Sequence, residues 1–247
     1  MNFISPKVRS QLAPHGVLSA AVYLGNFLLV TGRSPSGEPA GIAPDICREI
    51  ANRLDVELKL IGHETQDEVV ESAASGKCGI VLLGSDPARA KKVTFTPAYV
   101  ELEATYLVLD NSPIHNVSQV DRPGIRIASF FKSAYDLWLQ RNLQHATLVH
   151  ADSIQASNDL FVNEKLDALA GLKTGLITAA QKIPGSRVLD GQFTGIQQAI
   201  ATQNANHEAV QFLTACVEEF ISTSLVANLI QKYRVQGLAP APLNKSS

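Results

Sequence analysis

The sequence predicts an α/β protein with two lobes, and three observations lead to that fold class. Apolar runs of strand length alternate with helical patterns over residues 16–84, in the order strand, helix, strand, helix, strand. That order implies a parallel sheet. A similar alternation restarts at residue 125. In each half, turns with glycine or serine separate strands from helices, and such folds bind ligands at the carboxyl ends of their strands. A cleft between the two lobes is the expected site.

The elements of the first half follow from the spacing of apolar residues. Ile46, Ile50 and Leu54 recur at intervals of four, which indicates one face of a helix. A continuous apolar run over 78–84 is typical of a strand covered on both faces. We expect strands over 16–24, 57–63 and 78–84, helices over 43–56 and 66–76, and a short strand from residue 93 that stops at Pro97.

The second half repeats this organisation and ends in helices. We expect strands over 104–110, 125–130, 146–151, 166–171, 186–191 and 195–202, and helices over 133–144, 154–165 and 174–182. A last helical stretch over 207–233 is expected to break near residues 222–224. The proline-rich tail over 237–247 is expected to be frayed.

Composition and charge restrict the class of partner. The chain has 247 residues, of which 45% are hydrophobic and 18% charged, as in a protein with a good core. Its net charge of -2 argues against nucleic acid or an acidic membrane as the main partner. No segment approaches the ~20 apolar residues that span a bilayer. The widely spaced Cys47, Cys78 and Cys216 predict neither a disulfide framework nor a zinc site.

An arginine stands out in the stretch LGSDPARAKKVTFTPAY, residues 83–99. Asp86 and Pro87 suit the start of a helix, so a helix amino end is expected beside Gly84 and Ser85. Free N–H groups and the helix dipole favour an anion there. Arg89 adds a planar charge that fits a carboxylate with two hydrogen bonds. The alternative is that Arg89 is a solvated surface side chain.

A matching feature begins the first helix of the second half. Ser133 and Asp136 are three residues apart, a spacing similar to a capping box, and Lys132 precedes them. This helix amino end could face the same ligand, but for Ser133 taken alone plain helix capping, which needs no ligand, is the favoured interpretation. Trp138 is expected to pack in the core. The nucleophile-elbow, P-loop, dinucleotide-binding and zinc-protease motifs are all absent, and the histidines are scattered, so we expect no cofactor and no metal.

Several segments resemble one family. GSDPARAKKVTFTPAYV resembles the S-x-T-x-x-R-x-x-x-x-F-S-x-P-Y signature of type II periplasmic solute-binding proteins, in the polar amino-acid branch that serves ABC importers (extracellular solute-binding protein family 3). GEPAGIAPDICREIANRLDVELKLI, VSQVDRPGIRIASFFKSAYD and NEKLDALAG are similar, in order, to three further family segments. The resemblance covers residues 18–233.

The resemblance implies a type II periplasmic-binding-protein fold whose two crossover strands act as a hinge. These strands would lie near 105–109 and 197–201. The first lobe would take residues 1–107 and 199–247, and the second lobe 108–198. Ligand binding would close the cleft by a hinge motion.

The resemblance also implies binding residues. Arg89 matches the arginine that binds the ligand carboxylate in the family. Gly84 and Ser85 match the neighbouring loop, and Ser133 and Ala134 match the helix entry of the second lobe.

This chain departs from the family where an ammonium group is usually held. The acidic residue expected after the V-D-A segment falls near Leu172, with Lys173 next, and the first strand offers Asn26 rather than an acid. Glu103 is a possible replacement partner for an ammonium group. Otherwise the ligand lacks the amine, and Lys173 either faces a second anionic or polar group or is a solvated loop residue.

Two classes of function are open. The first is a monomeric, non-catalytic solute-binding protein for amino acid transport, which captures a small carboxylate or amino-acid-like ligand, with an ABC permease as a possible partner. The second is a cytosolic dehydratase-like lyase or a ligand sensor on the same scaffold, with Glu103 and Lys173 as the candidate acid and base. The resemblance implies a periplasmic location. However, the chain shows no signal peptide, so it would be cytoplasmic if Met1 is native.

Overall fold

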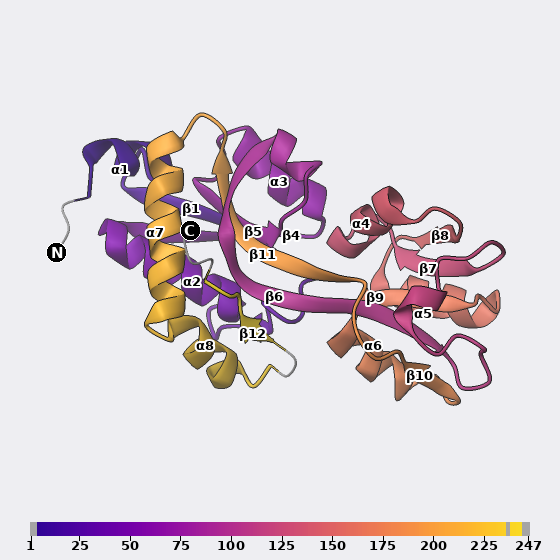
Figure 1. The fold of residues 1–247 in the computed structure, drawn as a ribbon. Coiled ribbons are helices and arrows are strands. Elements are labelled where there is room, and N and C mark those ends of the chain that lie inside the picture. Colours follow the sequence, from indigo (N-terminus) through magenta and orange to yellow (C-terminus); the bar gives the residue numbers. More distant parts are fainter. Residues whose placement is uncertain (1–3, 236–237, 244–247) are drawn as a thin grey trace. The chain divides into compact units, whose positions relative to one another are not determined.

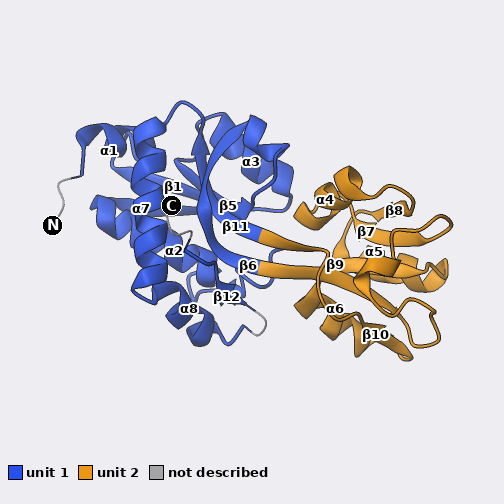
Figure 2. Ribbon diagram, in the orientation of Figure 1, with its two compact units in different colours: residues 1–101, 197–247 blue, residues 102–196 orange. Residues whose placement is uncertain are grey.

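The computed structural model describes residues 4–235 and 238–243, and Figure 1 labels its elements. The chain divides into two compact units, which Figure 2 colours separately. Unit 1 takes Met1–Glu101 and Gln197–Ser247, and unit 2 takes Leu102–Ile196. Residues 102–107 thus belong to unit 2 and residues 197–198 to unit 1, opposite to the lobes expected for them. The boundaries fall inside two long strands, β6 and β11, rather than in turns between elements.

Unit 1 is built on a mixed sheet with strand order β4-β1-β5-β11-β6. Strand β1 pairs in parallel with β4 and β5, and β11 pairs antiparallel to β5. The strands are β1 (Val17–Tyr23), β4 (Glu57–His63), β5 (Ile80–Gly84), β6 (Val93–Leu109), β11 (Thr194–Gln203), β12 (Ala239–Pro240) and the pair β2 (Gly32–Arg33) and β3 (Pro39–Ala40). The helices are α1 (Pro6–Leu12), α2 (Ile42–Leu54), α3 (Gln66–Ala74), η1 (Arg89–Lys91), α7 (His207–Ser222) and α8 (Leu225–Tyr233).

The predicted apolar faces form the core of unit 1. Ile46, Ile50 and Leu54 of α2 are fully buried, and every residue of β5 is buried, as expected for a strand covered on both faces. Helix α3 begins with a capping box between Thr65 and Glu68. Gly76 follows its end with a positive φ of 73°. These parts of the sequence-based prediction are confirmed.

Strand β6 is where the prediction for unit 1 was wrong. It runs without interruption through Pro97, where we expected a strand to stop. A proline cannot donate to a strand ladder. Next to it, Thr96 Oγ1 accepts a hydrogen bond from Ile200 N at 3.2 Å and ties β6 to β11 at this point. This contact holds β6 in the sheet beside the proline, although it does not replace the missing donor.

The chain ends of unit 1 also differ from expectation. Helix α1 was not predicted. In the tail, β12 pairs with β6, and the buried Ala241 donates its N–H to Tyr99 O at 3.1 Å, so this part is not frayed. Residues 237 and 244–247 of the predicted tail lie outside the described residues. The break expected near 222–224 is confirmed, because α7 ends at Ser222 and α8 starts at Leu225.

Unit 2 is built on a sheet with strand order β6-β9-β7-β8, and β10 also pairs with β6. Strand β7 is parallel to β8 and β9, and β9 is antiparallel to β6. The strands are β7 (Arg126–Phe130), β8 (Thr147–Ala151), β9 (Ala168–Leu172) and β10 (Ser186–Val188), and the helices are η2 (Val117–Gln119), α4 (Ala134–Asn142), α5 (Ile154–Asn163) and α6 (Lys173–Ala180). The strand predicted over 104–110 is the second part of the long β6, which begins at Val93. The other predicted strands and helices of this half are present, with ends shifted by a few residues.

The core of unit 2 has an apolar and an aromatic part. Leu107, Leu169 and Phe161 are buried in one cluster. The ring of Trp138, on α4, lies 5.4 Å from the ring of Phe193, which in turn lies 4.6 Å from Tyr106. Trp138 therefore packs against an aromatic neighbour, as expected, but it is half-buried and not a core residue.

Two global features complete the description. The three cysteines are buried free thiols. In the described part of the chain, no single helix has the length and apolar composition of a membrane span, and only the pair α7 and α8, bent by 67°, meets these criteria when taken together.

Candidate functional site

The carboxyl end of β5 in unit 1 holds the arginine that the sequence singled out. Arg89 is only 8% exposed, so it is not a solvated surface side chain. Its Nη1 donates to Gly84 O at 2.6 Å, and its Nη2 donates to Gln66 Oε1. A carbonyl and an amide, both uncharged, thus fix one side of the guanidinium at the end of the strand.

The charge on Arg89 survives its burial. Desolvation lowers the pKa of Arg89 to about 10, although the nearby carboxylates of Asp86 and Asp67 act in the opposite direction. The guanidinium is therefore still protonated at neutral pH. A charged donor in a poorly solvated place interacts strongly with an anion that enters beside it.

The helix expected after Asp86 is not formed. Asp86 Oδ1 accepts from Ala88 N at 2.8 Å, as a capping residue does, but only the three-residue turn η1 follows. Strand β6 starts at Val93 and leaves no room for a longer helix. The anion attraction predicted from a helix dipole is therefore lost, and that from the guanidinium remains.

Gly84 and Ser85 are engaged within unit 1. Gly84 O accepts from Arg89, and Ser85 N donates to Gln197 O at 2.7 Å. The sequence analysis expected a free N–H group beside them. The N–H of Ser85 instead completes the pairing of β5 with β11.

Two glutamines near Arg89 were missed by the sequence analysis. Gln66, the first residue of α3, accepts from Arg89. Gln198, on β11, is paired with Gly84 in the sheet and is 5% exposed. Its Oε1 accepts from Nδ2 of the predicted site residue Asn26 at 3.4 Å. The only sequence signal for Gln198 was a pair of glutamines inside an apolar strand.

In unit 2, Ser133 caps the amino end of α4, which is the helix-capping role considered for it from the sequence. Ser133 is buried, and its Oγ accepts from Asp136 N at 3.2 Å. Asp136 is fully buried, and its Oδ2 accepts from Lys132 N at 3.0 Å. Ala134 is the first residue of the helix. His150 adds to this cluster, with its Nε2 3.1 Å from Asp136 Oδ1.

The candidate acid and base of unit 2 are paired with each other. Lys173 Nζ lies 2.6 Å from Glu103 Oε2, and the two side chains are 35% and 50% exposed. The antiparallel register of β6 and β9, in which Ala104 is paired with Leu172, brings them side by side. Glu103 is therefore not an unpaired carboxylate, and Lys173 is not merely a solvated loop residue.

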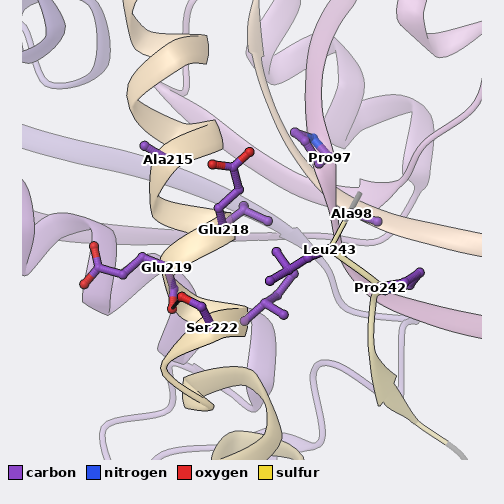
Figure 3. Close-up of a pocket in the computed structure, with 10 residues that line it drawn as sticks. Pro97, Ala98, Ala215, Glu218, Glu219, Ser222, Pro242 and Leu243 are labelled. Atoms are coloured by element: carbon purple, nitrogen blue, oxygen red, sulfur yellow. Dashed lines mark hydrogen bonds between the residues drawn. The ribbon is translucent and has the colours of Figure 1, made fainter. Parts of the chain in front are cut away.

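The site candidates lie on strand ends rather than in a pocket on the α7 side of unit 1. A pocket of about 550 Å³ is lined by Pro97, Ala98, Pro242, Leu243 and residues of α7 (Figure 3). None of the predicted site residues lines it. Its walls are mostly apolar, and its charged side chains, Glu218 and Glu219, are acidic. A carboxylate ligand would find no cation among its lining residues.

Strand order and residue chemistry together define the class. Each unit carries helices on a mixed sheet, the chain passes between the units twice, in β6 and β11, and polar side chains gather at the carboxyl ends of strands. This is the type II periplasmic-binding-protein fold.

Comparison with known proteins gives the family. The model for bacterial extracellular solute-binding proteins, family 3, matches residues 27–236, and the chain belongs to this family. No curated protein matches the chain.

Solved structures show the same fold at low sequence identity. A solute receptor for L-cysteine from Neisseria gonorrhoeae has a TM-score of 0.74 and 18% identity, with 96% of this chain and 100% of that chain covered. A mutant of ArgBP from T. maritima has a TM-score of 0.71 and 19% identity, with 92% and 99% covered. The ancestral amino-acid-binding protein AncCDT-1, a precursor of cyclohexadienyl dehydratase, has a TM-score of 0.71 and 19% identity, with 91% of this chain and 98% of that chain covered.

Proposed function

We propose that this chain is a non-catalytic binding protein that captures a small carboxylate or an amino-acid-like solute. The observation that carries the proposal is the buried, protonated Arg89 at the end of β5. Its contacts with Gly84 and Gln66 fix the orientation of the guanidinium. A carboxylate is the anion that best fits a guanidinium fork.

Unit 2 contributes a second set of groups to the proposal. Strands β7 and β9 are parallel neighbours, so their carboxyl ends lie at the same edge of the sheet. Ser133 and Ala134 follow β7, and Lys173 follows β9 beside Glu103. We assign these four residues to ligand binding as well, with Lys173 as the cation for an acceptor group of the ligand.

The family membership supports a transport role. The solved structures with this fold include, by their descriptions, a receptor for L-cysteine and the substrate-binding protein of an amino acid ABC transporter. We propose that this chain serves an ABC importer in the same way, as a monomer outside the cytoplasm.

A lyase on the same scaffold is the alternative that we do not favour. It would need a general acid or base free to meet the substrate. The carboxylate of Glu103 is held by Lys173 at 2.6 Å, and we propose that this pair serves ligand recognition rather than proton transfer.

The experiment is to identify the ligand directly. Protein purified without denaturation is unfolded in acid, and the released small molecules are measured by mass spectrometry. The refolded, ligand-free protein is then titrated with each candidate by calorimetry. We expect one bound solute that carries a carboxylate and leaves chemically unchanged after incubation. Turnover of the solute would favour the lyase, and absence of any binding to carboxylates would refute the proposal.

A further inference from the structure

An amide pair beside Arg89 points to the chemistry of the rest of the ligand. We propose that Gln198 and Asn26 form a ligand subsite of unit 1 that takes an uncharged hydrogen-bonding group, such as a carboxamide, hydroxyl or thiol. This inference rests on the proposed function, because it concerns the ligand whose carboxylate Arg89 binds.

The position of the pair follows from the order of the strands. In the sheet of unit 1, β5 lies between β1 and β11. Asn26 follows β1, and Gln198 lies on β11, so the hydrogen bond between them passes the carboxyl end of β5. Gln198 is paired with Gly84, whose carbonyl oxygen accepts from Arg89. Neighbouring strands are only ~5 Å apart. A small ligand held by Arg89 is therefore within reach of the two amides.

The hydrogen bond fixes which groups the amides can offer. Gln198 Oε1 accepts from Asn26 Nδ2 at 3.4 Å. Gln198 Nε2 is thus left to donate and Asn26 Oδ1 to accept. Within residues 4–235 and 238–243, neither of these two atoms makes a hydrogen bond. A donor and an acceptor side by side complement a group that itself both accepts and donates.

Burial explains why this group should be uncharged. Gln198 is 5% exposed, so a ligand group that docks against it loses most of its water. A carboxylate or an ammonium would have to lose its hydration without a counter-ion from either amide, which is costly. A neutral polar group has its hydrogen bonds replaced by those of the amides at little cost.

The test exchanges one amide for an acid. Wild-type protein and the variant Gln198→Glu are titrated by calorimetry with glutamine, asparagine, serine, cysteine, glutamate and lysine. We expect the wild type to bind at least one neutral member more tightly than glutamate and lysine. In Gln198→Glu, the ratio of lysine affinity to neutral-ligand affinity should rise at least tenfold, since the new carboxylate offers the ammonium a partner. The half-buried Asn26→Asp should produce the same change, should Gln198→Glu fail to fold.

A control and the remaining outcomes make the result decisive. Gln203→Glu changes the same residue type at the other end of β11, where Gln203 Nε2 donates to Ala74 O, and should leave the ratio unchanged. Ratios within twofold of wild type in both subsite variants would overturn the subsite while the binding function stands. A wild type that prefers glutamate or lysine would overturn it too. A wild type that binds none of the six probes would refute the proposed function for amino acids, and the subsite with it.

Discussion

Replacing Arg89 by methionine should separate ligand binding from folding. Methionine keeps much of the length of the side chain and removes its charge. The pKa of Arg89 is lowered to about 10 by burial, against an ordinary value of 12.5. Since one pKa unit corresponds to about 1.4 kcal/mol, holding the charge in this place costs about 3 kcal/mol relative to water. Arg89→Met removes that cost.

The same change leaves two acceptors without their donor. Gly84 O and Gln66 Oε1 both accept from the guanidinium. Gly84 is buried and Gln66 is half-buried, and an unsatisfied buried acceptor costs about 1–3 kcal/mol. The two effects have opposite signs and similar size. We therefore expect the free energy of unfolding to change by less than about 2 kcal/mol. The affinity for a carboxylate ligand, by contrast, should fall by about 2–5 kcal/mol, as when one partner of a buried charge pair is removed.

Urea unfolding and calorimetry measure the two quantities on the same sample. The variant Arg89→Lys is the matched control, because it keeps the charge but not the planar fork, and should retain part of the affinity. The reasoning is refuted if Arg89→Met binds the ligand as tightly as wild type, or if it loses more than about 4 kcal/mol of stability.

Three further predictions concern other parts of the two units. Gln66→Ala should weaken carboxylate binding about tenfold, because Gln66 orients Arg89. The control Glu71→Ala, on the exposed side of the same helix, should leave the affinity unchanged. Calorimetric titration curves that are the same for Gln66→Ala and wild type would exclude this positioning role. Lys173→Ala should change the free energy of unfolding by less than about 1 kcal/mol, because the ion pair with Glu103 is partly exposed. It should also raise the affinity for alanine relative to lactate, because the carboxylate of Glu103 becomes available to the amine of alanine. An unchanged ratio of the two affinities would place the pair outside the ligand site. In Asp121, burial acts to raise the pKa, but N–H donors from residues 144–146 outweigh it and lower the pKa below its usual range. The stabilisation is therefore present above the unfolded-state pKa of about 3.9 and is lost as the pH falls through the lower folded-state value. Asp121→Asn should reduce the urea midpoint at pH 7 but not near pH 2, and an equal reduction at both would contradict this origin.

The fold was predictable where one residue pattern sufficed. Helix α2 follows from Ile46, Ile50 and Leu54, and β5 from an unbroken apolar run. The break between α7 and α8 falls where polar residues interrupt the helical pattern. The prediction for β6 was wrong because a proline often ends a strand, and no local signal shows that Thr96 accepts a hydrogen bond from the distant Ile200 beside Pro97.

The sequence was enough to select the charged residue Arg89 of the candidate site, but not to predict how the site residues are arranged. Arg89 could be selected from its spacing, yet the length of η1 depends on where β6 begins. The pairing of Glu103 with Lys173 depends on the register between β6 and β9, which sequence alone does not give. Gln198 could not be selected, because the pair of glutamines in this strand does not show which of them lies beside Asn26.

The position of β11 inside the sheet of unit 1 has a consequence for synthesis. Unit 2 comes from one continuous stretch, Leu102–Ile196, and is complete once that stretch has left the ribosome. Unit 1 begins to emerge first but lacks an inner strand until residue 203 has been made, because β11 lies between β5 and β6. Domains fold as units during translation. The nascent chain should therefore complete unit 2 before unit 1, and the edge of β5 that pairs with β11 should stay exposed until residue 203 has been made.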